Sequence, residues 1–341
     1  MTRPFIPPLD RRFCVAPMMD WTTRHCRAFH RVLSKGALLY TEMVTADALI
    51  HGDPQRLIGF DPCEHPVALQ LGGSDPDKLA RATQIGTAFG YDEINLNVGC
   101  PSDRVQSGRF GACLMREPSL VAECMVAMRE ATALPVTVKN RLGVDEQEPR
   151  DSLFAFTQTV ANSGVNVFIV HARKAWLKGL SPKDNREIPP LDYEIVRELK
   201  RAHPHLTIIL NGGLSTIAQV KNDMTGLDGV MLGRAAYHDP ALLGRVDCEI
   251  LGMDTDVVTP EAAFIGFRPY IDARLREGVP LHTMTRHMLG LFMGRAGARL
   301  FRRTLSEHTR DGAGLEVYDA ALEIIERETQ RAQLYLERSA A

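Results

Sequence analysis

One cysteine of this sequence stands where it could donate a proton to a substrate. Cys100 lies in the segment 95–101, Asn-Leu-Asn-Val-Gly-Cys-Pro, directly after an apolar run typical of a buried strand. A thiol can protonate a developing carbanion that lies within hydrogen-bond reach. The alternative is a small buried side chain, the commonest role of a free cysteine. We expect that buried role for four other cysteines, Cys14, Cys63, Cys124 and Cys248.

Polar side chains also occur at or near the ends of other apolar runs. Lys139 and His171 each end such a run, and a buried lysine is unfavourable unless it is paired or solvated. Each could simply reach solvent, but together with Gln70 they favour a cofactor site. The polar residues in such positions are Gln70, Asn95, Asn97, Lys139, Asn140, His171, Arg173, Asn211 and Arg234.

Two glycine-containing segments end the last two apolar runs. They are Asn211-Gly212-Gly213 and Gly233-Arg234. Glycine lets backbone N–H groups approach an oxyanion closely, and barrels of eight strands often bind a phosphate at the loops after strands seven and eight. Either segment alone could be a tight turn. Together they favour a cofactor that carries a phosphate.

A stripe of arginines lies near the C-terminus. Residues 286–310 hold six arginines and a single acidic residue, Glu307, which gives this segment a net charge of +5. Such a stripe suits the phosphates of a nucleic acid. A solvated helix face paired with the acidic last helix (Glu323, Glu326 and Glu328) explains it equally well. Four of these residues, spaced i, i+4, i+7, i+8, share one helix face and form the arginine stripe: Arg295, Arg299, Arg302 and Arg303.

A second basic cluster follows the sixth apolar run. Two basic clusters around one site favour a polyanionic substrate. The members of this second cluster are Lys174, Lys178, Lys183 and Arg186.

Short apolar runs that alternate with helical segments must position these residues. Runs of this kind suit strands buried on both faces, as in a parallel sheet, and eight βα units over about 235 residues fit a TIM barrel. An open doubly wound sheet is the alternative, but no glycine fingerprint follows the first run. The predicted strands are Phe13–Met18, Leu38–Met43, Val67–Gly72, Glu93–Val98, Val136–Asn140, Val167–Ala172, Thr207–Asn211 and Gly229–Gly233. The predicted helices include one that begins at Asp75-Pro76, and Pro118–Thr132, Asp151–Ser163 and Asp192–Ala202.

The pattern changes after about residue 245. Residues 252–260 look like a linker, and from Glu261 onward no further strand is predicted. We therefore expect an α/β protein with two domains, a (β/α)8 barrel over residues 1–250 and an all-helical domain over residues 255–341.

Composition sets limits on the function. The 341 residues carry a formal net charge of −2, so a surface that binds nucleic acid must be local. Seven cysteines without a C-x-x-C pair argue against a zinc site or a disulfide framework, and free thiols indicate a reducing compartment. We find no signal peptide or membrane span. The sequence predicts a cytoplasmic protein without a metal and shows no obligate protein partner.

The motifs resemble those of the tRNA-dihydrouridine synthases, over nearly the whole chain. Within that family the segment 172–187 resembles the A subfamily, which acts on uridines 20 and 20a of the tRNA D-loop. The matching segments are Ala16–Cys26, Gln70–Gly73, Asn95–Pro101, Val138–Gly143, His171–Arg173, Asn211–Gly213 and Gly233-Arg234.

The resemblance implies an FMN cofactor reduced by NADPH, with Cys100 as the proton donor to the uracil ring. The helical domain would be the RNA-binding domain of the family. FMN contacts are implied for Pro17, Met18, Met19, Gln70, Lys139, His171, Asn211, Gly212, Gly213, Gly233 and Arg234. Contacts with tRNA are implied for Asn97, Lys183, Arg186, Arg299 and Arg302.

Two other functions are compatible with the residues. A flavin barrel that reduces a free pyrimidine, as the dihydroorotate dehydrogenases do, would leave the arginine stripe without a role. A tRNA-binding module without activity could keep a flavin site that is no longer used. Reduction of tRNA, tested beside free uridine, separates these alternatives.

Overall fold

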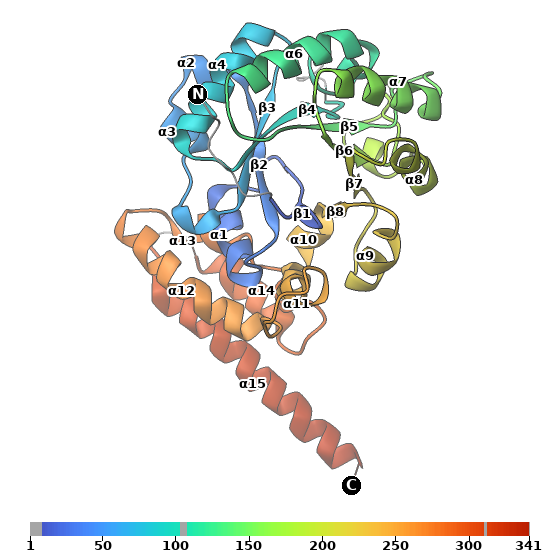
Figure 1. Ribbon diagram of the computed structural model, residues 1–341. Coiled ribbons are helices and arrows are strands. Elements are labelled where there is room, and N and C mark those ends of the chain that lie inside the picture. Colours follow the sequence, from blue (N-terminus) through green and yellow to red (C-terminus); the bar gives the residue numbers. More distant parts are fainter. Residues whose placement is uncertain (1–8, 103–107, 310–311, 341) are drawn as a thin grey trace. The chain divides into compact units, whose positions relative to one another are not determined.

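The computed structural model describes residues 9–102, 108–309 and 312–340. Eight parallel strands form a closed barrel in the order β1 to β8, each strand pairing with the next and β8 pairing with β1. Figure 1 shows these strands at the centre of the first unit. The predicted TIM barrel is confirmed. The strands are β1 (Phe13–Val15), β2 (Leu38–Thr45), β3 (Val67–Gly72), β4 (Glu93–Val98), β5 (Val136–Arg141), β6 (Val167–His171), β7 (Thr207–Asn211) and β8 (Gly229–Leu232).

The apolar runs form these strands because both of their faces are buried. Every residue of β3, β4 and β8 is buried, as expected for a sheet that is covered by helices outside and filled by side chains inside. Part of the barrel interior is apolar and is built from small and large side chains in or next to six strands, β1, β2, β3, β6, β7 and β8. This cluster consists of Cys14, Ala16, Leu38, Tyr40, Ala68, Ile169, Ile209 and Met231.

The chain folds into two compact units. The first comprises the chain up to Thr22 and Gly36–Gly233, and the second comprises Thr23–Lys35 and the chain from Arg234 onward. The contiguous boundaries 1–250 and 255–341 remain a prediction. The notable difference is that α1, the helix after β1, clusters with the C-terminal segment.

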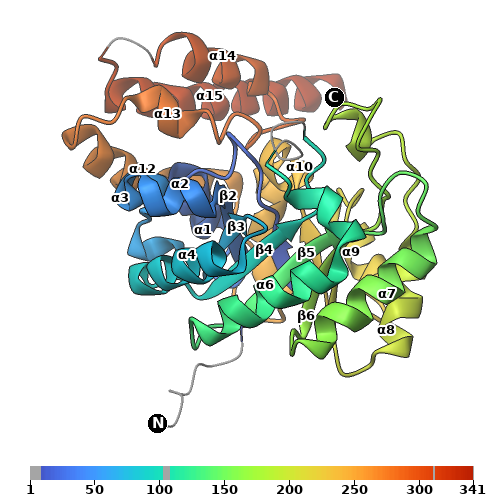
Figure 2. The same cartoon turned by 90° about the horizontal axis from the view of Figure 1, so that it is seen from above.

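Helices of the first unit cover the outside of its strands, as Figure 2 shows for α4, α6 and α7. The predicted start at Asp75 is confirmed, because the Asp75 side chain accepts from the backbone N–H of Lys78 and Pro76 opens the helix. The helices are α2 (Ala46–His51), α3 (Pro54–Ile58), η1 (Pro62–Glu64), α4 (Pro76–Phe89), η2 (Gly111–Arg116), α6 (Pro118–Glu130), α7 (Pro149–Asn162), η3 (Asp184–Arg186), α8 (Tyr193–Ala202) and α9 (Ile217–Asp223).

The second unit is helical in all of its described secondary structure. A cluster of aromatic rings forms part of its core, in which Phe264 stacks on Tyr318 with ring centroids 3.9 Å apart. Among the helices that the structure describes, none is long and apolar enough to cross a membrane. The helices are α1 (Arg24–Leu33), α10 (Arg234–His238), η4 (Pro240–Arg245), α11 (Val246–Glu249), α12 (Pro260–Arg276), α13 (Leu281–Thr285), α14 (Ala298–Glu307) and α15 (Leu315–Ala340).

Candidate active site

The carboxyl ends of the barrel strands bring most of the predicted site residues together. Asn97 lies in register with Lys139, and Arg141 lies in register with His171. His171 in turn lies in register with Asn211. These residues come from the four successive strands β4 to β7, so the closed barrel places them around one end, where enzymes of this architecture bind their substrates. We call this end the mouth.

Lys139 is held inside the mouth by one hydrogen bond. Its Nζ donates to Oδ1 of Asn211 over 2.9 Å, and Nδ2 of Asn211 donates to the carbonyl of Met231. Burial, reinforced by the positive charge of Arg141, lowers the pKa of Lys139 to about 7. No carboxylate pairs with the Lys139 ammonium among the described residues. A negatively charged ligand would therefore stabilise its charged form.

Arg141 is a buried residue of the mouth that sequence reasoning missed. Its side chain donates from Nε to the carbonyl of Gly99 over 3.1 Å and from Nη1 to the carbonyl of Asn185 over 2.9 Å. Burial lowers its pKa to about 10, and no ion pair with a carboxylate forms within the part of the chain that the structure describes. Its spacing of two from Lys139 was the available signal, because alternate residues of a strand share a face.

His171 adds a neutral imidazole to the mouth. Burial, together with the charges of Arg141 and Lys139, lowers its pKa well below the ordinary value. Neither ring nitrogen has a hydrogen-bond partner among the described residues. One nitrogen of a neutral imidazole donates and the other accepts, so His171 can bond to a ligand without adding to the positive charge.

Gly212 and Gly213 need to be glycines. Their φ angles are +113° and +76°, in the region that L side chains rarely adopt. A Cβ on Gly212 would lie 2.6 Å from the His171 ring, and one on Gly213 would lie 2.4 Å from Leu191. The backbone after β7 is thus exposed at a place where no side chain fits, as expected where a ligand approaches the main chain.

Cys100 lies just after β4, and the side chain of Asn97 holds its backbone. The backbone N–H groups of Gly99 and Cys100 both donate to Oδ1 of Asn97 over 3.0 Å. The thiol is partly exposed and donates to the Ser102 hydroxyl over 3.5 Å. Residues 103–107, which continue this loop, lie outside the described residues.

The other residues for which FMN contacts were predicted follow β1 or β8, lie within the barrel, or belong to the second unit. Pro17 and Met18 follow β1 and are partly buried, and the Met18 sulfur lies 3.6 Å from the position of a Cβ on Gly233. Met19 is exposed over 54% of its surface. Gln70 is buried inside the barrel. Arg234 is exposed and begins α10 in the second unit.

Two polar residues expected at strand ends are fully buried. Asn95 lies within the barrel, where it bonds to Gln70 and Thr137. Asn140 donates to the carbonyl of Arg141, while its Oδ1 has no partner within the described chain. Strand position alone did not separate residues of the mouth from residues of the interior.

Lys183 and Arg186 are exposed on a loop that a buried amide organises. Asn185 has no exposed surface, and its side chain bonds to both the N–H and the C=O of Trp176, at 2.7 and 2.8 Å. These two hydrogen bonds hold η3 in place, while Lys183 and Arg186 remain on the surface.

The arginine stripe divides into two pairs. Arg295 bonds to Glu261 over 2.6 Å, and Arg303 bonds to Glu307 over 3.3 Å. Arg299 and Arg302 are exposed and form no ion pair among the residues that the structure describes. The partners of Arg295 and Arg303 lie on α12 and α14, so pairing with the acidic last helix is not what the structure shows.

The prediction for four buried cysteines is correct only in part. Cys14 and Cys124 are buried, whereas Cys248 is partly exposed and Cys63 is exposed. Cys63 lies in the short helix η1, between Pro62 and a buried Glu64, so the exposed side of one helical turn falls on it.

Comparison with known proteins agrees with this geometry. A family model described as dihydrouridine synthase (Dus) matches residues 14–326. A protein of Xanthomonas campestris pv. campestris named tRNA-dihydrouridine(20/20a) synthase is 55% identical over 94% of this chain and 95% of its own length. Proteins of the same name from Yersinia pestis and Vibrio cholerae are 55% and 56% identical over 92% and 91% of this chain, and over 92% and 95% of their own lengths.

The fold also has a counterpart among solved structures. Morphinone reductase superposes with a TM-score of 0.50 at 14% identity, covering 74% of this chain and 88% of its own. At that identity the likeness concerns the barrel fold alone. The family match and the relatives confirm the resemblance found in the motifs, and the chain belongs to the dihydrouridine synthase family.

Proposed function

We propose that this protein is a tRNA-dihydrouridine synthase that reduces the C5–C6 double bond of uridines 20 and 20a in the tRNA D-loop. The reaction would depend on FMN, with NADPH as the source of electrons. Relatives that carry the name tRNA-dihydrouridine(20/20a) synthase over more than nine tenths of the chain support it. The enzyme would act in the cytoplasm and would need no protein partner.

The observation that carries the proposal is the uncompensated positive charge of the mouth. Lys139 and Arg141 are cations, both have lowered pKa values because they are buried, and the described structure gives neither a carboxylate. A negatively charged partner would raise the pKa of Lys139 and compensate the charge that Arg141 carries at neutral pH. Both a phosphorylated flavin and an RNA phosphate are partners of this kind.

The two glycines after β7 also support FMN as the ligand. The backbone at Gly212 and Gly213 leaves no room for a Cβ, which suits the close approach of a phosphate to N–H groups. Lys139 would lie against the part of the flavin that becomes negative when reduced. The residues proposed to hold FMN are Pro17, Met18, Met19, Gln70, Lys139, His171, Asn211, Gly212, Gly213, Gly233 and Arg234.

When bound, FMN supplies the hydride for C6 of the uracil ring. Cys100 provides the proton for C5, because its thiol is partly exposed at the mouth and its backbone is fixed by Asn97. The target uridine must leave the base stack of the tRNA to reach Cys100 and the flavin. Asn97 would hold the edge of the base, since its amide reaches the mouth with one N–H still available.

Exposed cations would bind the tRNA backbone. Arg299 and Arg302 have no carboxylate to compete with phosphate among the described residues, and Lys183 and Arg186 stand on a turn that Asn185 holds by hydrogen bonds. Each phosphate contact releases counterions, so the affinity for tRNA should fall as salt rises.

The decisive experiment replaces the proton donor. Cys100→Ala should lower dihydrouridine formation by about 10²-fold or more, in the range expected for the loss of a general acid. Flavin binding and reduction of the flavin by NADPH should stay as in the wild type. Single-turnover mixing of the reduced protein with unmodified tRNA, followed by flavin absorbance, separates the two half-reactions.

Cys63→Ala is the matched control, because Cys63 is exposed and lies outside the mouth. Product formation by Cys100→Ala at the rate of this control would contradict the role of Cys100. Equal reduction of free uridine and tRNA would instead favour an enzyme for small pyrimidines.

A further inference from the structure

A row of hydrogen-bonded side chains runs through the barrel interior from its amino-terminal end to the Cys100 loop. Its links are 2.7 Å from Thr137 to Glu93, 2.8 Å from Asn95 to Thr137, 2.8 Å from Gln70 to Asn95, and 2.8 Å from Asn97 to Gln70. We call this row the interior network. It consists of Glu93, Thr137, Asn95, Gln70 and Asn97.

Strand register explains why these residues meet. Gln70 is in register with Asn95, and Asn95 is in register with Thr137, so the three lie side by side on neighbouring strands. Glu93 and Asn97 lie two residues before and after Asn95, which places them on the same inward face of β4.

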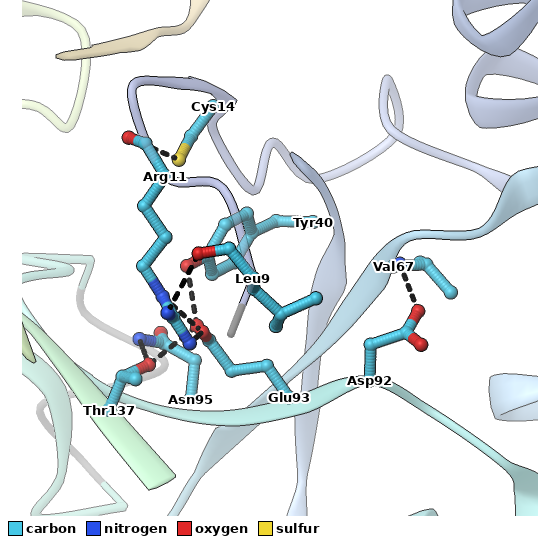
Figure 3. A network of polar contacts seen from close by, with 9 residues as sticks. All are labelled: Leu9, Arg11, Cys14, Tyr40, Val67, Asp92, Glu93, Asn95 and Thr137. Atoms are coloured by element: carbon cyan, nitrogen blue, oxygen red, sulfur yellow. Dashed lines mark hydrogen bonds and ion pairs between the residues drawn. The ribbon is translucent and has the colours of Figure 1, made fainter. Parts of the chain in front are cut away.

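The amino-terminal end of the interior network can only accept hydrogen bonds. The Glu93 carboxylate is paired with Arg11, whose Nη2 lies 2.5 Å from Oε2, and it also accepts from the hydroxyl of Tyr40. Figure 3 shows this carboxylate among its donors. Thr137 must therefore direct its hydrogen toward Glu93, which leaves the Thr137 oxygen to accept from Asn95.

The other end can only donate. Two backbone N–H groups, of Gly99 and Cys100, point at Oδ1 of Asn97. That oxygen cannot serve as a donor, so the NH₂ group of Asn97 faces Gln70. Both ends impose the same direction on the two amides between them. A reversal of one amide would place two donors or two acceptors against each other.

We propose that the interior network fixes the orientation of the Asn97 amide and thereby holds the backbone of Gly99 and Cys100. Glu93, Thr137 and Asn95 are positioning residues for the loop, although none of them reaches the mouth. The expected effect of the interior network on catalysis rests on the proposed function, whereas its effect on the backbone of the loop does not.

Removal of one hydroxyl tests the proposal. Thr137→Val keeps the shape of the side chain but breaks the link between Glu93 and Asn95. We expect the backbone amides of Gly99 and Cys100 to exchange hydrogen about 5-fold faster, the effect of weakening one ordinary hydrogen bond. Hydrogen exchange of the flavin-loaded protein, read by mass spectrometry in a peptide that covers residues 96–102, measures this.

Tyr40→Phe provides the matched control. It removes a hydroxyl that bonds to the same oxygen of Glu93, but Tyr40 is not part of the interior network. Exchange at the loop should stay within about 2-fold of the wild type in this variant, and Thr137→Ser should restore the wild-type rate because it keeps the hydroxyl. Equal acceleration by Tyr40→Phe and Thr137→Val, or none by Thr137→Val, would overturn the proposal.

The kinetic arm keeps the two proposals apart. Thr137→Val should lower kcat for tRNA reduction several-fold while the KM for tRNA and flavin reduction by NADPH stay unchanged, and Thr137→Ser should restore kcat. If Cys100→Ala proves fully active, the proton role of Cys100 fails while the exchange result still decides the inference. Should Thr137→Val not fold, Thr137→Ala takes its place under the same criteria.

Discussion

The two ends of the barrel differ in whether their charged side chains have a partner of opposite charge. At the amino-terminal end, Glu93 has no exposed surface and is paired with Arg11 and bonded by two hydroxyl groups (Figure 3). At the mouth, the partly buried Lys139 and the buried Arg141 have only carbonyl and amide partners among the described residues. The first end is complete in the protein alone, whereas the anion proposed to bind at the mouth would complete the second. Under that proposal, unbalanced charge marks the functional end of the barrel.

The largest effect that would sharpen this comparison is on stability, at the amino-terminal end. Glu93→Gln leaves the Arg11 guanidinium largely buried without its carboxylate, which should lower the free energy of unfolding by about 3–5 kcal/mol. The midpoint of urea unfolding measures it, with the slope unchanged. Lys139→Met at the mouth should lower the same quantity by about 1 kcal/mol or less, the value of one hydrogen bond. Equal losses at the two ends would break the comparison.

The next largest effect is on ligand binding and is expected at the mouth. Lys139→Met should weaken FMN binding about 10- to 100-fold, since a hydrogen bond to a charged group is worth about 1.5–3 kcal/mol. Fluorescence titration of the flavin-free protein measures the dissociation constant. Lys78→Met, at an exposed lysine of α4, is the control and should bind FMN as the wild type does. Tight binding by Lys139→Met would show that the mouth does not need this cation.

A smaller effect follows from the pKa of Lys139. That pKa is lowered to about 7 in the free protein, so above pH 7 the Lys139 amine must take up a proton when an anionic ligand binds. FMN affinity should therefore fall as the pH rises through 7, by up to about 10-fold at pH 8. Calorimetric titration in two buffers with different ionisation enthalpies measures the proton uptake. Lys139→Met should show neither the uptake nor the slope.

The smallest effect extends the comparison to the arginine stripe. Arg299→Ala combined with Arg302→Ala should weaken tRNA binding several-fold and make its dependence on salt shallower by about two units of slope. Arg295→Ala combined with Arg303→Ala removes the same charge, but these arginines are already bonded to Glu261 and Glu307. The second double variant should have the smaller effect. A filter-binding series in increasing salt measures both, and identical slopes would mean that only net charge matters.

Most of the barrel could be predicted because its strands are buried on both faces. Six of the eight predicted strands, Val67–Gly72 and Glu93–Val98 among them, begin and end at or within one residue of the observed bounds at both ends. Glycine segments and single cations at strand ends likewise indicated the mouth. These features depend on local sequence, where the period of apolar residues and the conformational demands of glycine act directly.

The interior network could not be predicted by the same means. Asn95 was assigned to the strand ends because polar residues in apolar runs usually lie where the strand meets solvent. The missed signal was the alternation of Glu93, Asn95 and Asn97, which puts three polar side chains on one face of a strand without exposure. Their partners Gln70 and Thr137 come from neighbouring strands, and only the register of the closed barrel brings them together.

The place of α1 has a consequence for how this protein could be divided or exchanged. Phe29 of α1 is buried against Phe267 of α12, with ring centroids 5.2 Å apart. The hydroxyl of Thr23 bonds to His287 over 2.9 Å. A chain ended at residue 250 would keep α1 but lose both partners, and its buried face would meet water. The C-terminal segment is therefore not a cassette that a single crossover could trade between relatives, because one of the helices of its unit is encoded near the start of the gene.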